Sequence, residues 1–234
     1  MNVRKLLVLA CILVVAGCKE NGLTAFWDDV PLLEENLSVS EDRFAGFAEL
    51  AADVPEEEAM EALDKLFDRL QEDKVAYYVY AEWMEGAFYN FYSPCRSATL
   101  FSHVVQRIVS DGILSADECA PLQRKLDWIE VNQPGAPAMM PGIQPDGRRT
   151  LVVVLNLGCP ACREALTDLA SQPEWADVRR VALCCGHGPS PDAPGWEYAY
   201  PEHAASVFDL DMTPAYFVVA PSGLVEQSYT PVDR

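Results

Sequence analysis

The sequence predicts an α+β protein, in which an all-α N-terminal domain is followed by an α/β domain. Three observations support this fold class. Apolar residues recur at helical spacing through residues 24–133, whereas residues 134–234 alternate short apolar runs with a helical stretch. The first 17 residues form a separate apolar segment. We therefore expect a leader at 1–17, a linker at 18–23, a helical domain at 24–133 and an α/β domain at 134–234.

The N-terminal segment has the features of a secretion signal. Two basic residues precede an apolar run at 6–15, which is too short to span a membrane. The ending Ala16-Gly17-Cys18 resembles a bacterial lipobox, in which the cysteine is lipidated and becomes the mature N-terminus. This resemblance implies membrane attachment through a lipid on Cys18, in the cell envelope, at the periplasmic face or the outer membrane. Ordinary cleavage that leaves Cys18 free, or a retained anchor, is the alternative.

The net charge excludes one class of partner. It is −19, and loss of the leader, which carries Arg4 and Lys5 and no acid, makes it −21. A surface of this charge repels the phosphate backbone, so no nucleic-acid partner is expected. Half of the residues are apolar, which suffices for two modest cores.

Helix signals divide residues 24–133 into five segments. Ser38 with Glu41, and Ser115 with Glu118, have the spacing of a capping box at a helix start. Apolar residues at helical spacing, and Pro94 as a breaker, set the other limits. The expected helices lie at about 38–52, 55–70, 77–92, 97–110 and 115–131.

Aromatic residues crowd the third of these helices, namely Tyr77, Tyr78, Tyr80, Trp83, Phe88, Tyr89, Phe91 and Tyr92. Two interpretations are open. The side chains either pack against neighbouring helices or against the second domain, which is the more common role, or form a groove for an extended partner.

Two cysteines of the α/β domain stand at the junction of an expected strand, 151–157, and a helix, 163–170. A Cys-x-x-Cys at such a junction indicates a redox pair. Cys159 lies at the helix start, where unpaired N–H groups and the helix dipole favour the thiolate. Cys162, one turn later, can close the ring and release the product. The same spacing also suits zinc ligation or an inert disulfide.

A second motif follows the pair. Thr213-Pro214 leads into an apolar strand, and a turn at 221–223 leads into another at 224–229. The order of strand, Cys-x-x-Cys, helix, strand, helix, Thr-Pro and hairpin resembles the thioredoxin superfamily over residues 134–234. The resemblance implies a thioredoxin-like fold with a cis proline at Pro214. It also implies that Pro214 shapes a substrate groove and that Thr213 offers backbone hydrogen bonds to a bound peptide.

The whole arrangement resembles a family of Bacteroidetes thioredoxin-like lipoproteins. The features that carry this resemblance are the lipobox, the segment Phe26-Trp-Asp-Asp29, the helices, the segment Gln133 to Pro137 and the C-terminal unit. The helical domain of that family is known only as a domain of unknown function. The resemblance therefore implies an architecture and a compartment, and no substrate.

Two positions depart from the thioredoxin pattern. Gly158 stands where thioredoxin has a tryptophan, and Val153 stands where it has a buried acid. Without that acid, no obvious base deprotonates Cys162.

A metal site is an alternative, because five side chains supply soft or borderline ligand atoms: Cys159, Cys162, Cys184, Cys185 and His187. Adjacent residues of the expected strand at 178–185 point to opposite faces, so Cys184 and Cys185 should not both face the pair. We therefore expect no metal and no other cofactor. His103 and His203 are expected to be ordinary helix residues.

Cys95 and Cys119 are either small buried hydrophobes or the halves of a disulfide between two helices.

The sequence thus predicts an envelope lipoprotein that acts as a thiol–disulfide oxidoreductase through Cys159 and Cys162. Its partners are expected to be protein or peptide thiols and disulfides, and the direction of the reaction is not encoded. The alternative is a non-catalytic, partner-binding lipoprotein in which the Cys159–Cys162 disulfide is structural.

Overall fold

The computed structural model describes residues 22–231, and the chain divides into two compact units after Leu122. The division falls within the sixth helix, α6 (Ala116–Val131), so the last turns of this helix belong to the second unit. Cys18 and the expected leader lie outside the described residues. Among the described helices, none has the length and apolar character needed to cross a membrane.

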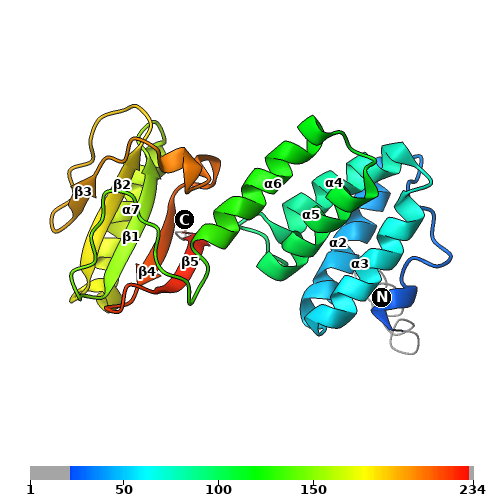
Figure 1. Ribbon diagram of the computed structural model, residues 1–234, viewed down its shortest axis with the longest axis horizontal. Helices are drawn as coiled ribbons and strands as arrows, with labels where there is room; N and C mark the ends of the chain where they lie inside the picture. Colours follow the sequence, from blue (N-terminus) through cyan, green and yellow to red (C-terminus); the bar gives the residue numbers. More distant parts are fainter. Residues whose placement is uncertain (1–21, 232–234) are drawn as a thin grey trace, which may run out of the picture. The chain divides into compact units, whose positions relative to one another are not determined.

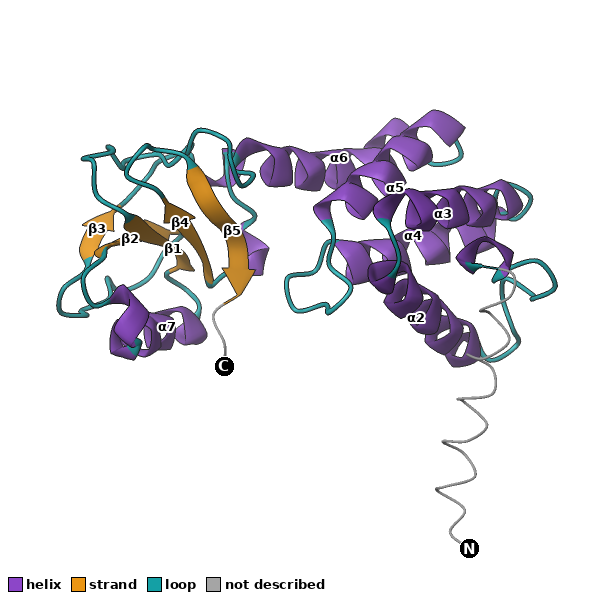
Figure 2. Ribbon diagram, turned by 90° about the horizontal axis from the view of Figure 1, so that it is seen from below, coloured by secondary structure: helices purple, strands orange, loops and turns teal. Residues whose placement is uncertain are grey.

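The first unit is all-α, as predicted (Figures 1 and 2). It opens with a short 3-10 turn, η1 (Leu23–Ala25), and continues through α2 (Leu37–Asp53), α3 (Glu56–Leu70), α4 (Lys74–Phe88), α5 (Ala98–Asp111) and the start of α6. Helix α3 contacts η1, α2, α4 and α5, which makes it the central helix of the unit.

One of the two predicted capping boxes is wrong and the other is confirmed. Helix α2 is capped by Asn36, whose side chain accepts a hydrogen bond from the Ser38 N–H, because Asn36 precedes the helix and Ser38 already lies inside it. At the start of α6, the Ser115 N–H donates to Glu118 Oε2 (2.7 Å) and the Glu118 N–H donates back to Ser115 Oγ (3.4 Å).

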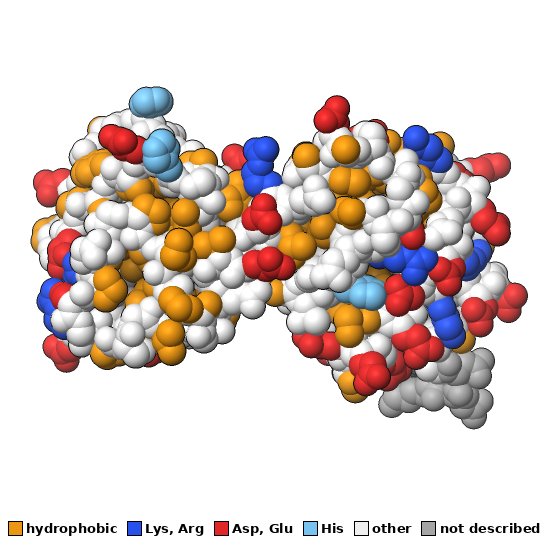
Figure 3. Space-filling view, in the orientation of Figure 1, with side chains coloured by type: hydrophobic (Ala, Val, Ile, Leu, Met, Phe, Trp, Pro, Cys, Tyr) orange, Lys and Arg blue, Asp and Glu red, His pale blue; other side chains and the backbone are white. Residues whose placement is uncertain are grey.

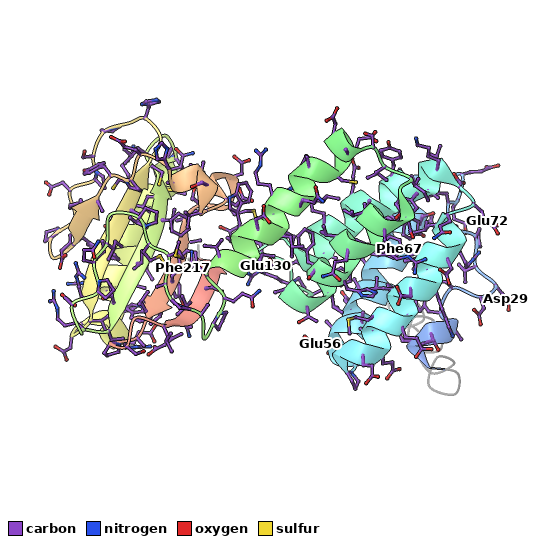
Figure 4. All side chains as sticks on the ribbon, in the orientation of Figure 1. Asp29, Glu56, Phe67, Glu72, Glu130 and Phe217 are labelled. Carbon is purple, nitrogen blue, oxygen red and sulfur yellow. The ribbon has the colours of Figure 1, made fainter. Side chains whose placement is uncertain are left out.

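The aromatic residues of α4 mainly form the core of this unit. The Tyr80 ring lies 5.6 Å from the Trp27 ring, and the Tyr80 hydroxyl donates to the Leu32 carbonyl (2.7 Å). The N-terminal segment is thereby held on the bundle. Phe67 of α3 is buried beside Tyr77, and Figure 4 shows its position within the unit. Most of these rings therefore pack in the interior of the unit and are not exposed on its surface.

The second unit contains a five-stranded mixed sheet with strand order β3-β2-β1-β4-β5. Its strands are β1 (Thr150–Asn156), β2 (Arg179–Cys185), β3 (Glu197–Ala199), β4 (Ala215–Val219) and β5 (Val225–Pro231). Strand β1 pairs parallel with β2 and antiparallel with β4. Together with helix α7 (Pro160–Ser171), which follows β1, this arrangement confirms the predicted fold class.

Helix α7 covers one face of the sheet (Figures 1 and 2). Val153 and Leu155 of β1 pack there with Leu166 and Leu169 of α7 in one buried cluster. On the other face of β4, Phe217 is fully buried and its ring lies 5.4 Å from that of Phe208 (Figure 4). Because α7 is anchored on its apolar side, its N-terminus is fixed where β1 ends.

The α-helix expected between the second strand and Thr213 is absent from the described stretch 186–212. That stretch instead holds β3 and two 3-10 turns, η3 (Ala204–Ser206) and η4 (Leu210–Met212). Glycine and proline interrupt residues 186–201, and the Asp209 side chain caps η4 by accepting from the Asp211 N–H (3.0 Å). His203 therefore precedes η3 and is not a helix residue, whereas His103 lies within α5, as expected.

The C-terminal turns of α6 are attached to this second unit. The Trp128 indole donates to the Ala205 carbonyl (3.0 Å), and the fully buried Asn132 side chain bonds the Met139 backbone twice. The Gly135 N–H then donates to the Val225 carbonyl of β5 (2.8 Å). The segment that enters the sheet is thus fixed by backbone and side-chain hydrogen bonds.

Candidate functional site

Cys159 is the N-cap residue of α7. Its backbone is extended (φ −94°, ψ 119°), and its N–H donates to the Asn156 carbonyl at the end of β1 (2.9 Å). Pro160 occupies the first helical turn, where its missing N–H costs nothing and its fixed φ suits the helix. The Cys159 side chain is partly exposed, so the first thiol of the pair is accessible at a helix N-terminus.

Cys162 differs from Cys159 in its burial, which controls thiol reactivity. It is 1% exposed and belongs to the cluster beneath α7. Burial raises the pKa of the Cys162 thiol to about 11, and the hydrogen bond with Cys159 and the negative charge of its thiolate act in the same direction. Hydrogen bonds with the Asn156 backbone and the Thr213 side chain lower this pKa, and burial outweighs them.

Thr213 and Pro214 lie beside the pair. The Thr213 side chain interacts with the Cys162 thiol and also donates to the Leu210 carbonyl (2.9 Å). The peptide bond between Thr213 and Pro214 is cis, as the resemblance to thioredoxins implied, and Pro214 is buried. The fold therefore brings Cys159, Cys162 and the Thr-Pro segment together.

Asn156 was not anticipated as part of the site. It is the last residue of β1, and its backbone interacts with the Cys162 thiol while its side-chain oxygen accepts from the Gly158 N–H (3.1 Å). A polar residue that ends an otherwise apolar strand was the available signal. The role itself depends on where the strand stops relative to the helix, which the sequence does not specify.

The loop after β2 lies directly against the loop that carries Cys159. A Cβ atom added at Gly188 would come within 2.3 Å of the Leu157 carbonyl oxygen, so backbone meets backbone there and only glycine fits. The His187 carbonyl oxygen lies 3.6 Å from the Cβ position of Gly158. The 186–188 segment thus packs against residues 157 and 158, directly before Cys159.

The two remaining cysteines of this unit both lie near the pair. Cys184 belongs to the buried cluster that contains Cys162, and Cys185 pairs with Asn156 in the ladder. Burial raises the pKa of both thiols, that of Cys185 to about 11, and the charges of Cys184 and Cys162 act on the pKa of Cys185 in the same direction. Within residues 22–231, no three His, Cys, Asp or Glu side chains are grouped so as to hold a metal ion.

The departures from thioredoxin have visible consequences. Val153 is fully buried in the cluster around Cys162, so the position of the thioredoxin acid is filled by an apolar side chain. That position therefore offers no carboxylate to accept a proton from Cys162. In the helical unit, Cys95 and Cys119 are both buried free thiols.

Comparison with known proteins supports the fold of this chain and does not establish its activity. Neither a protein-family model nor a curated protein matches the sequence. Among solved structures, the chain resembles a thioredoxin-like protein from Bacteroides caccae ATCC 43185, with a TM-score of 0.69 and 18% sequence identity. The match covers 88% of this chain and 86% of the other. The fold is thus thioredoxin-like, and redox chemistry is compatible with it.

Proposed function

We propose that the protein is a thiol–disulfide oxidoreductase in which Cys159 is the attacking thiol and Cys162 the resolving thiol. The observation that carries this proposal is the asymmetry of the pair. Cys159 is accessible at the start of α7, whereas Cys162 is buried one turn later and has a pKa of about 11. Such a difference assigns the two steps of an exchange reaction to different cysteines.

In the reducing direction, the Cys159 thiolate attacks one sulfur of a substrate disulfide. A mixed disulfide forms, and the other substrate sulfur leaves as a thiolate. Cys162 then loses its proton and attacks Cys159, which forms the Cys159–Cys162 disulfide and releases the second substrate thiolate. The substrate gains two electrons and the pair loses two. An external dithiol returns the two electrons to the pair. In the oxidising direction, the same steps run in reverse and oxidise a substrate dithiol.

The surroundings of Cys162 favour the first step over the second. The Asn156 backbone and the Thr213 side chain stabilise its thiolate, but burial dominates, and Val153 supplies no proton acceptor. The proposed mechanism therefore has fast formation of the mixed disulfide and slow resolution near neutral pH.

The proposed substrates are protein or peptide thiols and disulfides. Thr213 and Pro214 are the proposed binding residues, since this segment adjoins the pair and its extended backbone is suited to pairing with an extended peptide. No metal or other cofactor enters the mechanism. We also propose that a lipid on Cys18 holds the protein in the cell envelope, which rests on the Ala16-Gly17-Cys18 ending.

Turnover on a disulfide-linked protein tests this function. With insulin as substrate and dithiothreitol as reductant, the unaltered protein should accelerate reduction, and Cys159→Ser should lose the acceleration. Cys184→Ser, which removes a thiol of the same cluster, is the matched control and should retain it. Equal activity of the Cys159→Ser variant and the unaltered protein would refute the assignment.

A further inference from the structure

A groove in the helical unit is not explained by the redox chemistry. It has a volume of about 480 Å³, within the range of ligand-binding pockets. It lies between α2 and α4, which are side by side in the first unit (Figure 2), and the loop after α4 closes one end. Its lining residues are Glu41, Phe44, Ala45, Ala48, Glu49, Glu82, Trp83, Gly86, Ala87, Ser93, Pro94 and Cys95.

The apolar wall of the groove is built from two stacked rings and several small residues. The Trp83 ring stacks on that of Phe44, with 6.0 Å between the centroids, and Trp83 is only partly buried. Four small residues, Ala45, Ala48, Gly86 and Ala87, also line the groove and leave space in it. A Cβ atom added at Gly86 would have no other atom within 4 Å, so the groove is open at that point.

The rim of the groove is negatively charged. Glu41, Glu49 and Glu82 are exposed, and no lysine or arginine is among the described residues that line it. Arg96, which follows the lining loop, lies over the Phe91 ring, 4.9 Å from its centroid. Residues 22–122 as a whole carry 21 acidic and six basic side chains, and Figure 3 shows many of the acids on one face.

We propose that this groove binds an extended polypeptide segment that contains lysine or arginine. The stem of a basic side chain suits the apolar wall, its cation suits the face of Trp83, and the exposed carboxylates complement its charge. The small residues that line the groove leave room for the peptide backbone. The lining follows α2 from Glu41 to Glu49, about 12 Å of helix, which favours an extended chain over a compact ligand.

Binding of a designed peptide tests this proposal. The probe is a fluorescently labelled nine-residue peptide of alternating lysine and alanine, followed by anisotropy with the full-length protein. It should bind, more weakly at high salt, and a peptide with glutamate in place of lysine should not. Free N-acetyl-lysine amide at the same lysine concentration should fail to displace the peptide. Full displacement by it would overturn the assignment of a polypeptide.

Matched variants distinguish peptide binding in the groove from nonspecific attraction of the peptide to negative charge. Gly86→Leu fills the groove and should weaken binding at least about tenfold, whereas Gly46→Leu should leave it unchanged, because that helical glycine also has open space but does not line the groove. Glu49→Gln with Glu82→Gln should weaken binding about fivefold. The control pair is Glu56→Gln with Glu57→Gln, at the start of α3 (Figure 4), which removes the same charge elsewhere.

Equal loss of affinity in the two glutamine pairs, or in the two leucine variants, would show that the peptide does not occupy the groove. Absence of binding by the unaltered protein would overturn the proposal as well. The Trp83→Leu variant adds an independent readout, because it removes the aromatic face and keeps an apolar side chain. Its affinity should fall about threefold.

Discussion

At the scale of single residues, two thiols three positions apart have different environments. Cys159 ends the loop after β1 and is accessible, whereas Cys162 points into the cluster under α7. The helix N-terminus acts on both, but desolvation acts mainly on Cys162 and raises its pKa to about 11. The proposed division of roles follows from this difference in burial.

The order of alkylation follows from the same difference. With the reduced protein near pH 7, iodoacetamide should modify Cys159 at least about tenfold faster than Cys162, because only the accessible thiolate reacts. Peptide mass spectrometry over time measures both rates, and Cys184, buried in the same cluster, serves as the slow reference. Faster modification of Cys162 would reverse the assigned roles.

The pH dependence of resolution is a second consequence at this scale. Only the Cys162 thiolate attacks, so release from a preformed mixed disulfide on Cys159 should rise about tenfold per pH unit above pH 7. It should level off below pH 11, because the Cys159 thiol and thiolate that help to raise the pKa of Cys162 in the reduced pair are absent from the mixed disulfide. Rapid acid quenching and chromatography measure the release. The Cys95→Ser variant, which loses a buried thiol of the helical unit, should behave identically. A rate that is constant from pH 7 to pH 9 would contradict the account.

The positions of Cys159, Cys162 and Pro214 could be anticipated, because each stands at a change of pattern: strand to helix, or loop to strand. Asn156 and Gly188 could not. The role of Asn156 depends on where β1 stops relative to α7. The role of Gly188 depends on a loop remote in sequence, because only the folded chain brings its backbone against Leu157. The difference in burial between the two thiols is also known only from the structure.

At the scale of elements, apolar runs and chain breakers predicted most of the structure. The strand expected at 178–185 is β2 (Arg179–Cys185), and the helix expected at 163–170 is α7, which starts three residues earlier at Pro160. The helix expected before Thr213 failed, because few residues separate the last proline of that loop from Asp209, whose side chain caps a 3-10 turn. The spacing of apolar residues alone does not show that a short segment will form a 3-10 turn in place of an α-helix.

The start of α4 provides an element-scale prediction. Asp73 caps this helix by accepting from the Val75 and Ala76 N–H groups (2.9 and 3.1 Å). Asp73→Ala should lower the free energy of unfolding by about 1 kcal/mol, since both donors lose their partner. The matched control is Glu72→Ala, an exposed acid (Figure 4) one residue earlier whose side chain does not cap the helix. Urea unfolding monitored by circular dichroism measures both; equal losses would mean that the cap contributes nothing.

At the scale of the whole molecule, the negative charge is unevenly distributed. Residues 22–122 have a net charge of −15 out of −19 for the chain, from 21 acidic and six basic side chains. The thioredoxin-like unit carries much less, so the helical unit is where a cationic partner is expected to bind. In our two proposals, the redox pair lies in one unit and the groove for a cationic segment lies in the other.

Attachment to the membrane is a prediction about the whole molecule as well. Cys18→Ser should abolish lipid attachment, because a serine hydroxyl cannot form the thioether, and the protein should leave the membrane fraction. Fractionation followed by immunoblotting measures this, with Cys95→Ser as a control that retains Cys18. If the Cys18→Ser variant stays in the membrane fraction as before, the anchor lies elsewhere.

The most direct test of the central claim is the capture of substrates by Cys162→Ser. This variant keeps the attacking thiol and removes the resolving one, so mixed disulfides should accumulate on Cys159 and appear as reducible adducts on non-reducing gels of intact cells. Adding Cys159→Ser to it should remove them. A Cys162→Ser protein that is folded, as shown by its circular dichroism, and that forms no Cys159-dependent adduct would contradict the proposed function and favour a structural role for the pair.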